Sequence, residues 1–237
     1  MKTLFRILIL FLFCLCSLHV LCQRLDFEFG VNYGGYNMEE VKEFQEGIKS
    51  NYPVAPETMS NFPAHIGFDG RIGYTIARFR IFVFGSFNSS GSRLSYQDYS
   101  GSFEYNQLAK FKQIGAGSEF RLNANADSPW APFVSMQAGI GKTDFNVNDR
   151  TEVAGQTLGE DNLDFVSSHL SINPAIGIRR KILDHFFVSS SVGYFIDIAN
   201  PLQYKEDRDL NLLDDNYDAI SVNWSGFRIA LSLRVRF

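Results

Sequence analysis

The chain has 237 residues, of which 45% are hydrophobic, 15% aromatic and 20% charged, and its formal net charge at pH 7 is −4. The aromatic content and small net charge exclude an intrinsically disordered chain, and the acidic excess gives a nucleic-acid partner no electrostatic support. The length fits one or two domains, and an all-β barrel of this size can be a single one. After the first 22 residues, no apolar run approaches the ~20 residues that a transmembrane helix needs.

Residues 1–22 have the features of a secretory signal peptide. Two basic residues precede an almost wholly apolar run over 7–18, and a tolerable cleavage site precedes Gln23. As a helix this run would span only about 18 Å, too short to cross a bilayer, although a retained anchor is the alternative. We therefore predict a signal peptide over 1–22 and a barrel domain over 23–237. All three cysteines lie in the signal, so the mature chain has neither disulfides nor thiolate metal sites.

Beyond the signal, apolar and polar residues alternate with period two, which is typical of strands. In the first such segment Leu25, Phe27 and Phe29 alternate with Asp26 and Glu28. One later segment, 79–88, is apolar on both faces, so its orientation stays unassigned. We predict eight strands, over residues 24–36, 64–76, 79–90, 106–123, 130–144, 167–180, 185–198 and 222–237.

The connections between these strands alternate in length, at about 27, 2, 15, 6, 22, 4 and 23 residues, so every long loop lies at one end. A strand of about 13 residues tilted near 40° rises roughly 33 Å, enough to cross the ~25 Å apolar band of an outer-membrane barrel. The predicted fold class is therefore all-β, an antiparallel up-and-down eight-stranded transmembrane β-barrel. A ten-stranded count is the alternative.

Alternation alone does not say which face of the wall points inward. The polar face is rich in small residues such as Gly115, Gly117 and Gly139, which suit the narrow lumen of an eight-stranded barrel. The apolar face carries no charge in its central parts, where each charge would cost about 2 to 4 kcal/mol in a bilayer. We therefore predict apolar side chains that face lipid, and a soluble lipocalin-like barrel is the alternative.

Inward-facing charged residues predict an ionic plug in the lumen. Closure of the barrel should bring the last strand beside the first, so that Arg234 and Arg236 face Asp26 and Glu28. Charges buried in the lumen are costly unless they pair, so we expect mutual pairing rather than a thin selective conduit. The predicted network comprises Asp26, Glu28, Asp69, Arg71, Glu119, Arg121, Arg179, Arg228, Arg234 and Arg236.

The C-terminal segment ends in an aromatic residue preceded by apolar residues at alternate positions. These positions are Phe227, Ile229, Leu231, Leu233, Val235 and Phe237. The ending resembles the C-terminal assembly signal of Gram-negative outer-membrane proteins, and the mature chain is similar to the small eight-stranded barrels typified by OmpX and the OmpA membrane domain. The Gln23 start and segment 174–180 resemble more closely the PorT-like barrels of Bacteroidota.

This resemblance implies insertion by the barrel-assembly machinery, contact with outer-membrane lipid, periplasmic termini and long loops outside the cell. The charge distribution favours the same orientation, because the four long connections hold 18 acidic and 6 basic residues while the rest of the mature chain holds 8 and 14. Acidic loops can recruit cations or a basic partner, although solvated loops that are simply polar are the alternative.

A histidine and an aspartate offer a candidate catalytic pair. The turn near Leu183 would set His169 opposite Asp197, both inward and near the long-loop end. A carboxylate that orients an imidazole is half of a hydrolytic site, and Ser167 and Ser171 lie on the same strand as the histidine. A structural ion pair or hydrogen bond is the alternative, and we predict no catalytic residue.

The last long loop partly matches a calcium-binding loop. Relative positions 1, 3, 5 and 12 are taken by Asp207, Asp209, Asn211 and Asp218. Leu212 stands where the turn needs glycine, and the final ligand is Asp rather than the bidentate Glu. We therefore predict no specific metal site and no cofactor.

The sequence as a whole predicts a non-enzymatic, monomeric outer-membrane barrel whose extracellular loops serve surface binding or a structural role. Residues 38–49 have helical spacing and predict a short amphipathic helix in the first long loop. The PorT-like resemblance implies an alternative, an accessory component of protein secretion with a secretion-system partner. An outer-membrane hydrolase that uses His169 and Asp197 is the competing class.

Overall fold

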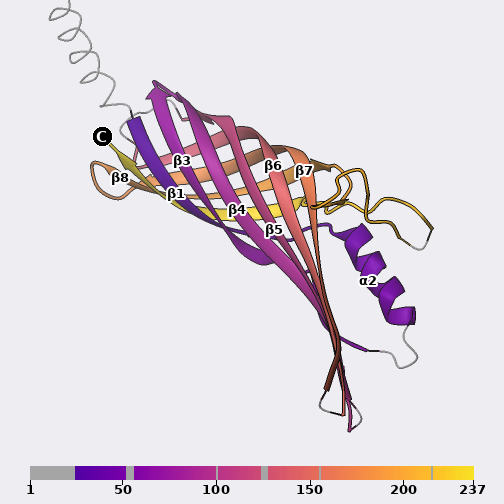
Figure 1. Ribbon diagram of the computed structural model, residues 1–237. Coiled ribbons are helices and arrows are strands. Elements are labelled where there is room, and N and C mark those ends of the chain that lie inside the picture. The colour runs from indigo at the N-terminus through magenta and orange to yellow at the C-terminus, as the bar shows by residue number, and fades with distance from the viewer. Residues whose placement is uncertain (1–24, 52–55, 100, 124–127, 155, 215) are drawn as a thin grey trace, which may run out of the picture.

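The computed structural model describes residues 25–51, 56–99, 101–123, 128–154, 156–214 and 216–237, so the predicted signal peptide lies outside the described residues. Eight antiparallel strands form a closed ring in which β1 pairs with β10 and each of the others pairs with its neighbours in the chain (Figure 1). The ring consists of β1 (Leu25–Gly34), β3 (His65–Ile76), β4 (Phe79–Gln97), β5 (Gly101–Arg121), β6 (Trp130–Val153), β7 (Gln156–Lys181), β8 (Phe186–Ala199) and β10 (Gly226–Arg236). The predicted eight-stranded up-and-down transmembrane barrel is confirmed.

The two faces of the barrel wall have the polarity of a membrane protein. Outward-facing Phe29, Ile114 and Ile140 are each more than half exposed, whereas inward-facing Asp26 and Arg234 are fully buried. A contiguous apolar exterior of this kind is unstable in water and stable against lipid. The predicted orientation of the faces is confirmed, and the lipocalin-like alternative, which would bury the apolar face, is wrong.

Segment 79–88, left unassigned by the sequence, has Arg80, Phe82 and Phe84 inside the barrel. Two phenylalanines in the lumen are what obscured its alternation. Phe82 fits because the facing residue on β5 is Gly117, where a Cβ would come within 2.5 Å of the phenylalanine ring. The small residues of the lumen thus make room for large ones on the neighbouring strand.

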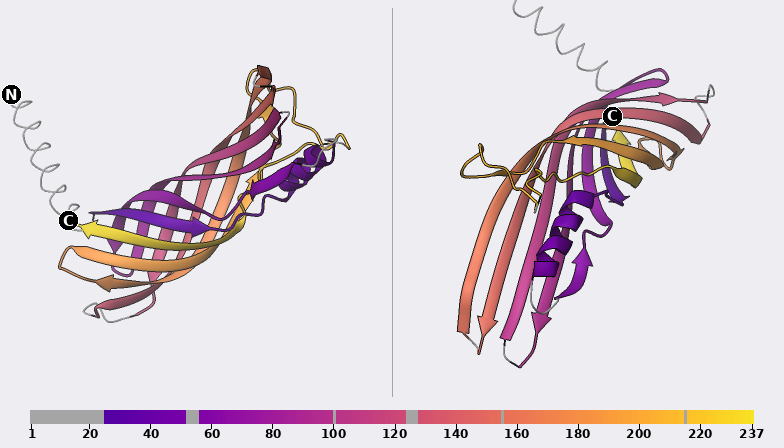
Figure 2. Two further views of the ribbon diagram at one scale, coloured as in Figure 1. Left: turned by 90° about the horizontal axis from the view of Figure 1, so that it is seen from below. Right: turned by 90° about the vertical axis from the view of Figure 1, so that its right-hand side faces the viewer.

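Four strands continue far beyond the barrel, which corrects two of the predicted loops. Pairing of β4 with β5 runs to Gln97–Ser102, and pairing of β6 with β7 runs to Val153–Gln156. The predicted loops of about 15 and 22 residues are therefore strand hairpins. We call the protruding four-stranded part the extension; it comprises residues 89–97, 101–110, 145–153 and 156–165, and it narrows away from the ring (Figures 1 and 2).

The extension has a hydrophobic core of the kind found in soluble proteins. Leu94, Phe145 and Phe165 on one face of its sheet are buried against α2 (Glu39–Asn51) and residues 200–225. Figure 2 shows the helix lying along that sheet face. Within α2, Val41, Phe44 and Ile48 face the core, while acidic residues in the first turn and Lys49 in the last complement the helix dipole. The predicted helix over 38–49 is confirmed.

Two short strands complete the loop end of the molecule, the end opposite the start of β1 and the end of β10. Strand β2 (Glu57–Asn61) pairs with β4, and β9 (Gln203–Tyr204) pairs with β7. The opposite end, which we call the turn end, carries the short connections and the start of β1 beside the end of β10. No helix in the described ranges is long and apolar enough to cross a membrane.

Candidate functional site

The lumen near the turn end is filled by three carboxylates and three guanidiniums, which we call the charged plug. Its members are Asp26, Glu28, Arg80, Glu119, Arg179 and Arg234. Glu28 accepts hydrogen bonds from Nε of Arg234 at 2.8 Å and from Nη1 of Arg71, at the edge of the plug, at 3.0 Å. Nη1 of Arg80 lies 2.9 Å from the same carboxylate. One buried carboxylate from β1 therefore holds guanidiniums from three other strands.

Glu119 on β5 closes the plug from the opposite wall. Arg179 donates two hydrogen bonds to its two carboxylate oxygens, both at 2.6 Å, and Nη2 of Arg234 donates a third at 2.8 Å. Asp26 forms an ion pair with Arg80 and lies 3.7 Å from Nε of Arg234. The three negative and three positive charges balance, and their bonds span the lumen from wall to wall, which is the condition for burying such charges.

Arg80 is a central member of this plug that the sequence analysis did not include. It lies on the strand whose orientation was unassigned, two residues after the turn that joins β3 to β4. Its guanidinium also stacks over the ring of Phe82, 4.9 Å from the centroid. Had Phe82 been placed inward, period two would have placed Arg80 inward as well.

The other predicted network residues fall into two groups. Nε of Arg71 lies 2.9 Å from Asp69, so the structure brings this pair together beside the plug. Arg121, Arg228 and Arg236 form no ion pair with a carboxylate among the described residues. Arg228 instead stacks on Phe195 at 3.5 Å. Arg236 is aligned with Asp26 in the backbone register, but the Asp26 carboxylate turns to Arg80 and Arg234.

Toward the loop end, the buried polar side chains of Asp197, His169 and Thr143 are hydrogen-bonded in a row. The rings of Tyr36, Phe111, Phe195 and Trp224 surround them, and we call this whole group the aromatic cap. Nδ1 of His169 lies 2.9 Å from Oδ2 of Asp197, and Nε2 lies 2.7 Å from Oγ1 of Thr143. The indole N–H of Trp224 donates to the same Thr143 hydroxyl at 2.9 Å, and the backbone N–H of Trp224 donates to Asp197 at 3.0 Å. Phe111 stacks on Trp224 with centroids 5.3 Å apart.

The predicted contact between His169 and Asp197 is present, although the register differs from the one predicted. Asp197 is aligned with Ser171, and His169 with Ala199, so the two side chains meet diagonally. The order carboxylate, imidazole, hydroxyl matches a catalytic triad, but the Thr143 and Trp224 side chains are fully buried and the Thr143 hydroxyl accepts a hydrogen bond from the indole. The arrangement ties residues 200–225 to the barrel wall.

The serines that were near the predicted pair have other partners. Ser171 accepts a hydrogen bond from Nε2 of Gln113 at 2.6 Å, and Ser167 donates to the carbonyl of Asn200 at 2.5 Å. We therefore expect the purified protein and its His169→Ala variant to show the same background rates in a screen of ester, phospholipid and peptide hydrolysis. Hydrolysis by the native chain that the variant lacks would contradict this assignment.

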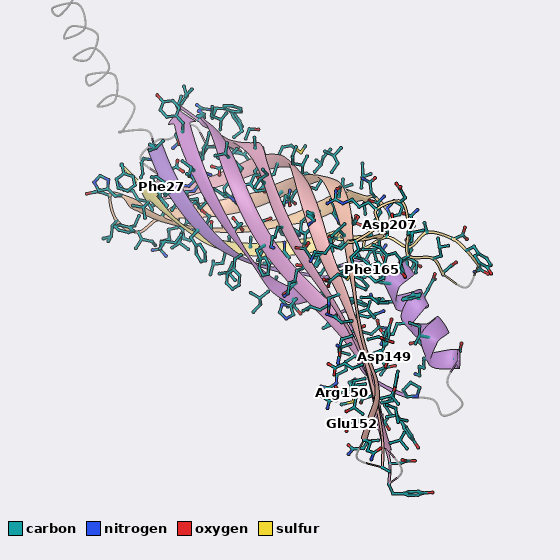
Figure 3. The ribbon with its side chains drawn as sticks, viewed as in Figure 1. Phe27, Asp149, Arg150, Glu152, Phe165 and Asp207 are labelled. Carbon is teal, nitrogen blue, oxygen red and sulfur yellow. The ribbon has the colours of Figure 1, made fainter. Side chains whose placement is uncertain are left out.

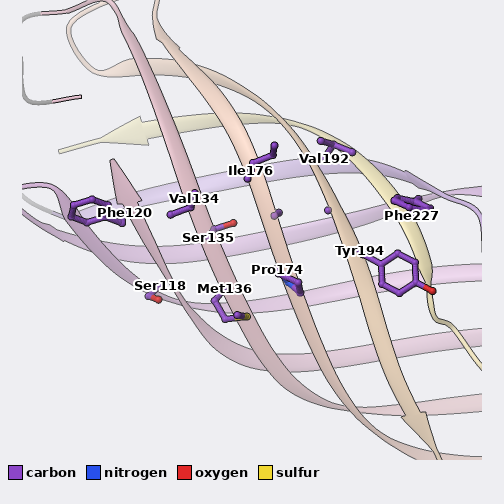
Figure 4. Close-up of a pocket in the computed structure, with 12 residues that line it drawn as sticks. Ser118, Phe120, Val134, Ser135, Met136, Pro174, Ile176, Val192, Tyr194 and Phe227 are labelled. Atoms are coloured by element: carbon purple, nitrogen blue, oxygen red, sulfur yellow. The ribbon is translucent and has the colours of Figure 1, made fainter. Parts of the chain in front are cut away.

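Hollows also lie between and beside the polar clusters. A cavity of about 30 Å³ between the charged plug and the aromatic cap is lined by polar groups such as Asn32, Gln113 and Asn173. A hollow of about 570 Å³ lies on the outer wall across β5, β6, β7, β8 and β10, where Met136, Pro174 and other apolar side chains line it without a charged group (Figure 4).

The calcium-like spacing in the last loop does not gather a metal site. Asp207 accepts a hydrogen bond from the backbone N–H of Asp209, and Asn211 is bridged to Gln203. The N–H of Asp218 donates to Asp214. Within the part of the chain that the structure describes, no three His, Cys, Asp or Glu side chains are grouped as ligands.

The extension leaves one sheet edge open. Strand β7 is paired with β6 along its full length, but its other edge has no strand partner from Gln156 to Leu163 among the described residues. The carbonyls of Asp164 and Ser168 accept hydrogen bonds on that outer edge, from the N–H groups of Lys205 and Asn200. The N–H and C=O groups of successive residues point to alternate edges of a strand. Asn162 lies two residues before Asp164, so its N–H and C=O point to the same outer edge as the Asp164 carbonyl.

This edge is acidic. Glu160 and Asp161 lie on it without a salt bridge among the described residues, and Asp161 faces Asp149 across the strand pair. Burial, together with the facing Asp161 carboxylate, raises the pKa of Asp149. Figure 3 shows Asp149, Arg150 and Glu152 on the narrow end of the extension, far from Phe27 on the barrel. A nearby positive charge would relieve the repulsion between these carboxylates.

Comparison with known proteins gives resemblances in fold. No protein-family model matches the sequence, and no curated protein matches it. Among solved structures, the chain is similar to Neisserial surface protein A, with 14% identity over 90% of this chain and 97% of that one and a TM-score of 0.42. The N-terminal β-barrel domain of Pseudomonas aeruginosa OprF shares 9% identity over the same shares, with a TM-score of 0.37. Ail, the attachment invasion locus protein of Yersinia pestis, shares 13% over the same shares, with a TM-score of 0.35.

Proposed function

We propose that this chain is a non-enzymatic outer-membrane barrel whose extension binds an extended, basic segment of another protein outside the cell. The segment would add as a strand to the open edge of β7. The observation that carries the proposal is this unpaired, acidic edge, held away from the membrane on a folded sheet. The proposed orientation has both termini in the periplasm and the extension outside.

We propose that the barrel is an anchor rather than a pore. In support, the charged plug and the aromatic cap cross the lumen at two levels, and a polar cavity of about 30 Å³ lies between them. The outward apolar faces of the strands provide the contact with lipid. A barrel closed in this way leaves the part beyond the membrane as the region that can meet a partner.

An open sheet edge is a template for a further strand, because its N–H and C=O groups point outward without partners. Alternate side chains of an added strand would lie beside Glu160 and Asn162 on one face and beside Asp161 and Leu163 on the other. The acidic side chains favour lysine or arginine in the added segment. They disfavour a second copy of this chain at the edge, because two β7 edges would place carboxylates side by side.

The same edge would serve an accessory role in protein secretion, where the secreted chain supplies the extended segment. The single-site test of either role is Asn162→Pro, which removes an outward N–H without touching the bonds to β6. Asn162→Ala is the matched control, because both variants lose the side-chain contact with Asn146 but only the proline variant loses the donor.

The probe is a fluorescent peptide of alternating lysine and valine, titrated against the purified protein in mild detergent. We expect saturable binding that Asn162→Pro weakens at least tenfold and Asn162→Ala leaves within twofold. A peptide of alternating glutamate and valine should not bind. Equal binding by all three proteins, or preference for the acidic peptide, would show that the edge is not the binding surface.

A further inference from the structure

A basic vestibule opens at the turn end of the barrel, on the far side of the charged plug from the lumen cavity. Its volume is about 190 Å³, equivalent to roughly six water molecules. The acidic side chains among its lining are Glu119 and Asp184. The basic side chains that line it are Arg78, Arg80, Arg121, Arg179, Lys181, Arg234 and Arg236.

Both acidic side chains of the vestibule are already paired. Glu119 is bound by Arg179 and Arg234, and Asp184 pairs with Lys181 at 2.9 Å. Arg121 and Arg236 have no carboxylate partner among the described residues, and the Nε of each is buried without a hydrogen-bond acceptor there. The vestibule therefore holds two inward-facing guanidiniums whose charge nothing in the described chain neutralises.

The positions of these two arginines are fixed by the fold. Arg236 stacks over the ring of Phe187, 4.8 Å from the centroid, and its backbone N–H donates to the carbonyl of His185. The backbone N–H of Arg121 donates to the carbonyl of Arg78 at 2.9 Å. The backbone of both residues is therefore fixed, and the stacked guanidinium of Arg236 loses little entropy when it binds an oxyanion.

We propose that the vestibule binds an anion of the phosphate class, with Arg121 and Arg236 as the two donors. Guanidinium pairs bind phosphate oxygens with charge-assisted hydrogen bonds, and the volume accepts a phosphate together with a few attached atoms. A free phosphate compound and the phosphate of a lipid headgroup share this chemistry. The bound anion would supply the negative charge that the vestibule lacks.

The test uses inorganic pyrophosphate, titrated by calorimetry into the full chain in zwitterionic detergent at low salt. We expect saturable binding, weakened at least tenfold by Arg121→Gln combined with Arg236→Gln. Arg180→Gln is a control for loss of an arginine at the same end, because its guanidinium lies outside, over Trp130. It should change the affinity by less than twofold.

The melting temperatures of the native protein and the double variant, measured without ligand, show whether weaker binding comes from misfolding or from loss of the site. Since Arg121 and Arg236 have no carboxylate partner in the described chain, the double variant should melt at the native temperature or slightly above it, through relief of repulsion. Pyrophosphate should then raise the melting temperature of the native protein and of Arg180→Gln but not that of the double variant.

A second arm distinguishes the sources of the anion. Micelles doped with phosphatidylglycerol are compared with micelles doped with phosphatidylcholine, by their effect on the melting temperature of the native protein and the double variant. Stabilisation by phosphatidylglycerol that depends on the two arginines supports a headgroup, and stabilisation by pyrophosphate alone supports a soluble compound. If neither stabilises the native protein, or if both act equally on the double variant, the proposal is wrong.

Discussion

Replacing Glu28 by glutamine should lower the free energy of unfolding by about 3 to 5 kcal/mol, the usual cost of removing one partner of a buried ion pair. The carboxylate is bound by Arg71, Arg80 and Arg234, and the last two are almost fully buried. An amide accepts fewer bonds and brings no charge, so the guanidiniums would be left with an uncompensated positive charge inside the barrel. Urea unfolding in lipid vesicles, followed by tryptophan fluorescence, measures the change.

The control for this variant is Glu104→Gln, which removes the same charge from an exposed ion pair with Arg93 on the extension. Exposed pairs contribute little, so its free energy of unfolding should change by less than about 1 kcal/mol. If Glu28→Gln were as stable as Glu104→Gln, the charged plug would not hold the barrel together. The loss should also persist in high salt, because buried pairs are only weakly screened.

The barrel could be predicted from the sequence because a membrane wall imposes a strict rule on every strand. Phe27, Phe29 and Val31 must face lipid, so the residues between them must face the lumen, and the register of β1 with β10 follows from closure. That rule places Arg234 and Arg236 beside Asp26 and Glu28, and in the structure Glu28 is aligned with Arg234 and Asp26 with Arg236. It assigns no face to segment 79–88, where Phe82 and Phe84 lie inside beside Arg80 and hide the alternation.

The extension could not be predicted, because the alternation of lipid-facing apolar residues and lumen-facing polar residues is required only in the part of a strand that contacts lipid. In the extension the outward residues of the four strands are mostly polar, such as Asn146 and Arg150, with Leu108 as an exception. The opposite face carries the buried aromatic and aliphatic side chains. This is the pattern of a soluble sheet, with the opposite polarity to the barrel below it. Where the apolar residues of one strand move from its outward to its inward face, the sequence pattern resembles a strand followed by a loop. For this reason the sequence predicts loops where the structure has two hairpins.

The aromatic cap depends on Trp224, which its place near a strand end would assign to an interfacial girdle but which is fully buried. Trp224 follows the last long loop, and nothing in its neighbourhood shows that its indole crosses to Thr143 on β6. The histidine and aspartate were visible through their shared inward face, so they suggested catalysis. The buried tryptophan that seals them, and gives them a structural role, follows only from the tertiary packing of residues 200–225.

Replacing Trp224 by alanine should therefore have the second large effect, a loss of about 3 to 5 kcal/mol for a fully buried aromatic side chain. It removes the stacking on Phe111 and the edge contact with Tyr36, and it leaves the Thr143 hydroxyl without its indole donor. Trp224→Phe keeps a ring and loses mainly the hydrogen bond, at about 1 kcal/mol. Trp130→Phe, at an exposed tryptophan of the turn end, should be nearly neutral.

The loss should be local as well as global, because the cap fastens residues 200–225 while the charged plug fastens the ring. We expect Trp224→Ala to make that loop the first site of protease cleavage, with the barrel still folded in detergent. It should also stay closed to ions in planar bilayers, since the plug formed by Glu28 and Glu119 lies below the cap and does not depend on it. Ion conductance that appears on removal of Trp224 alone would mean that the cap, and not the charged plug, closes the lumen.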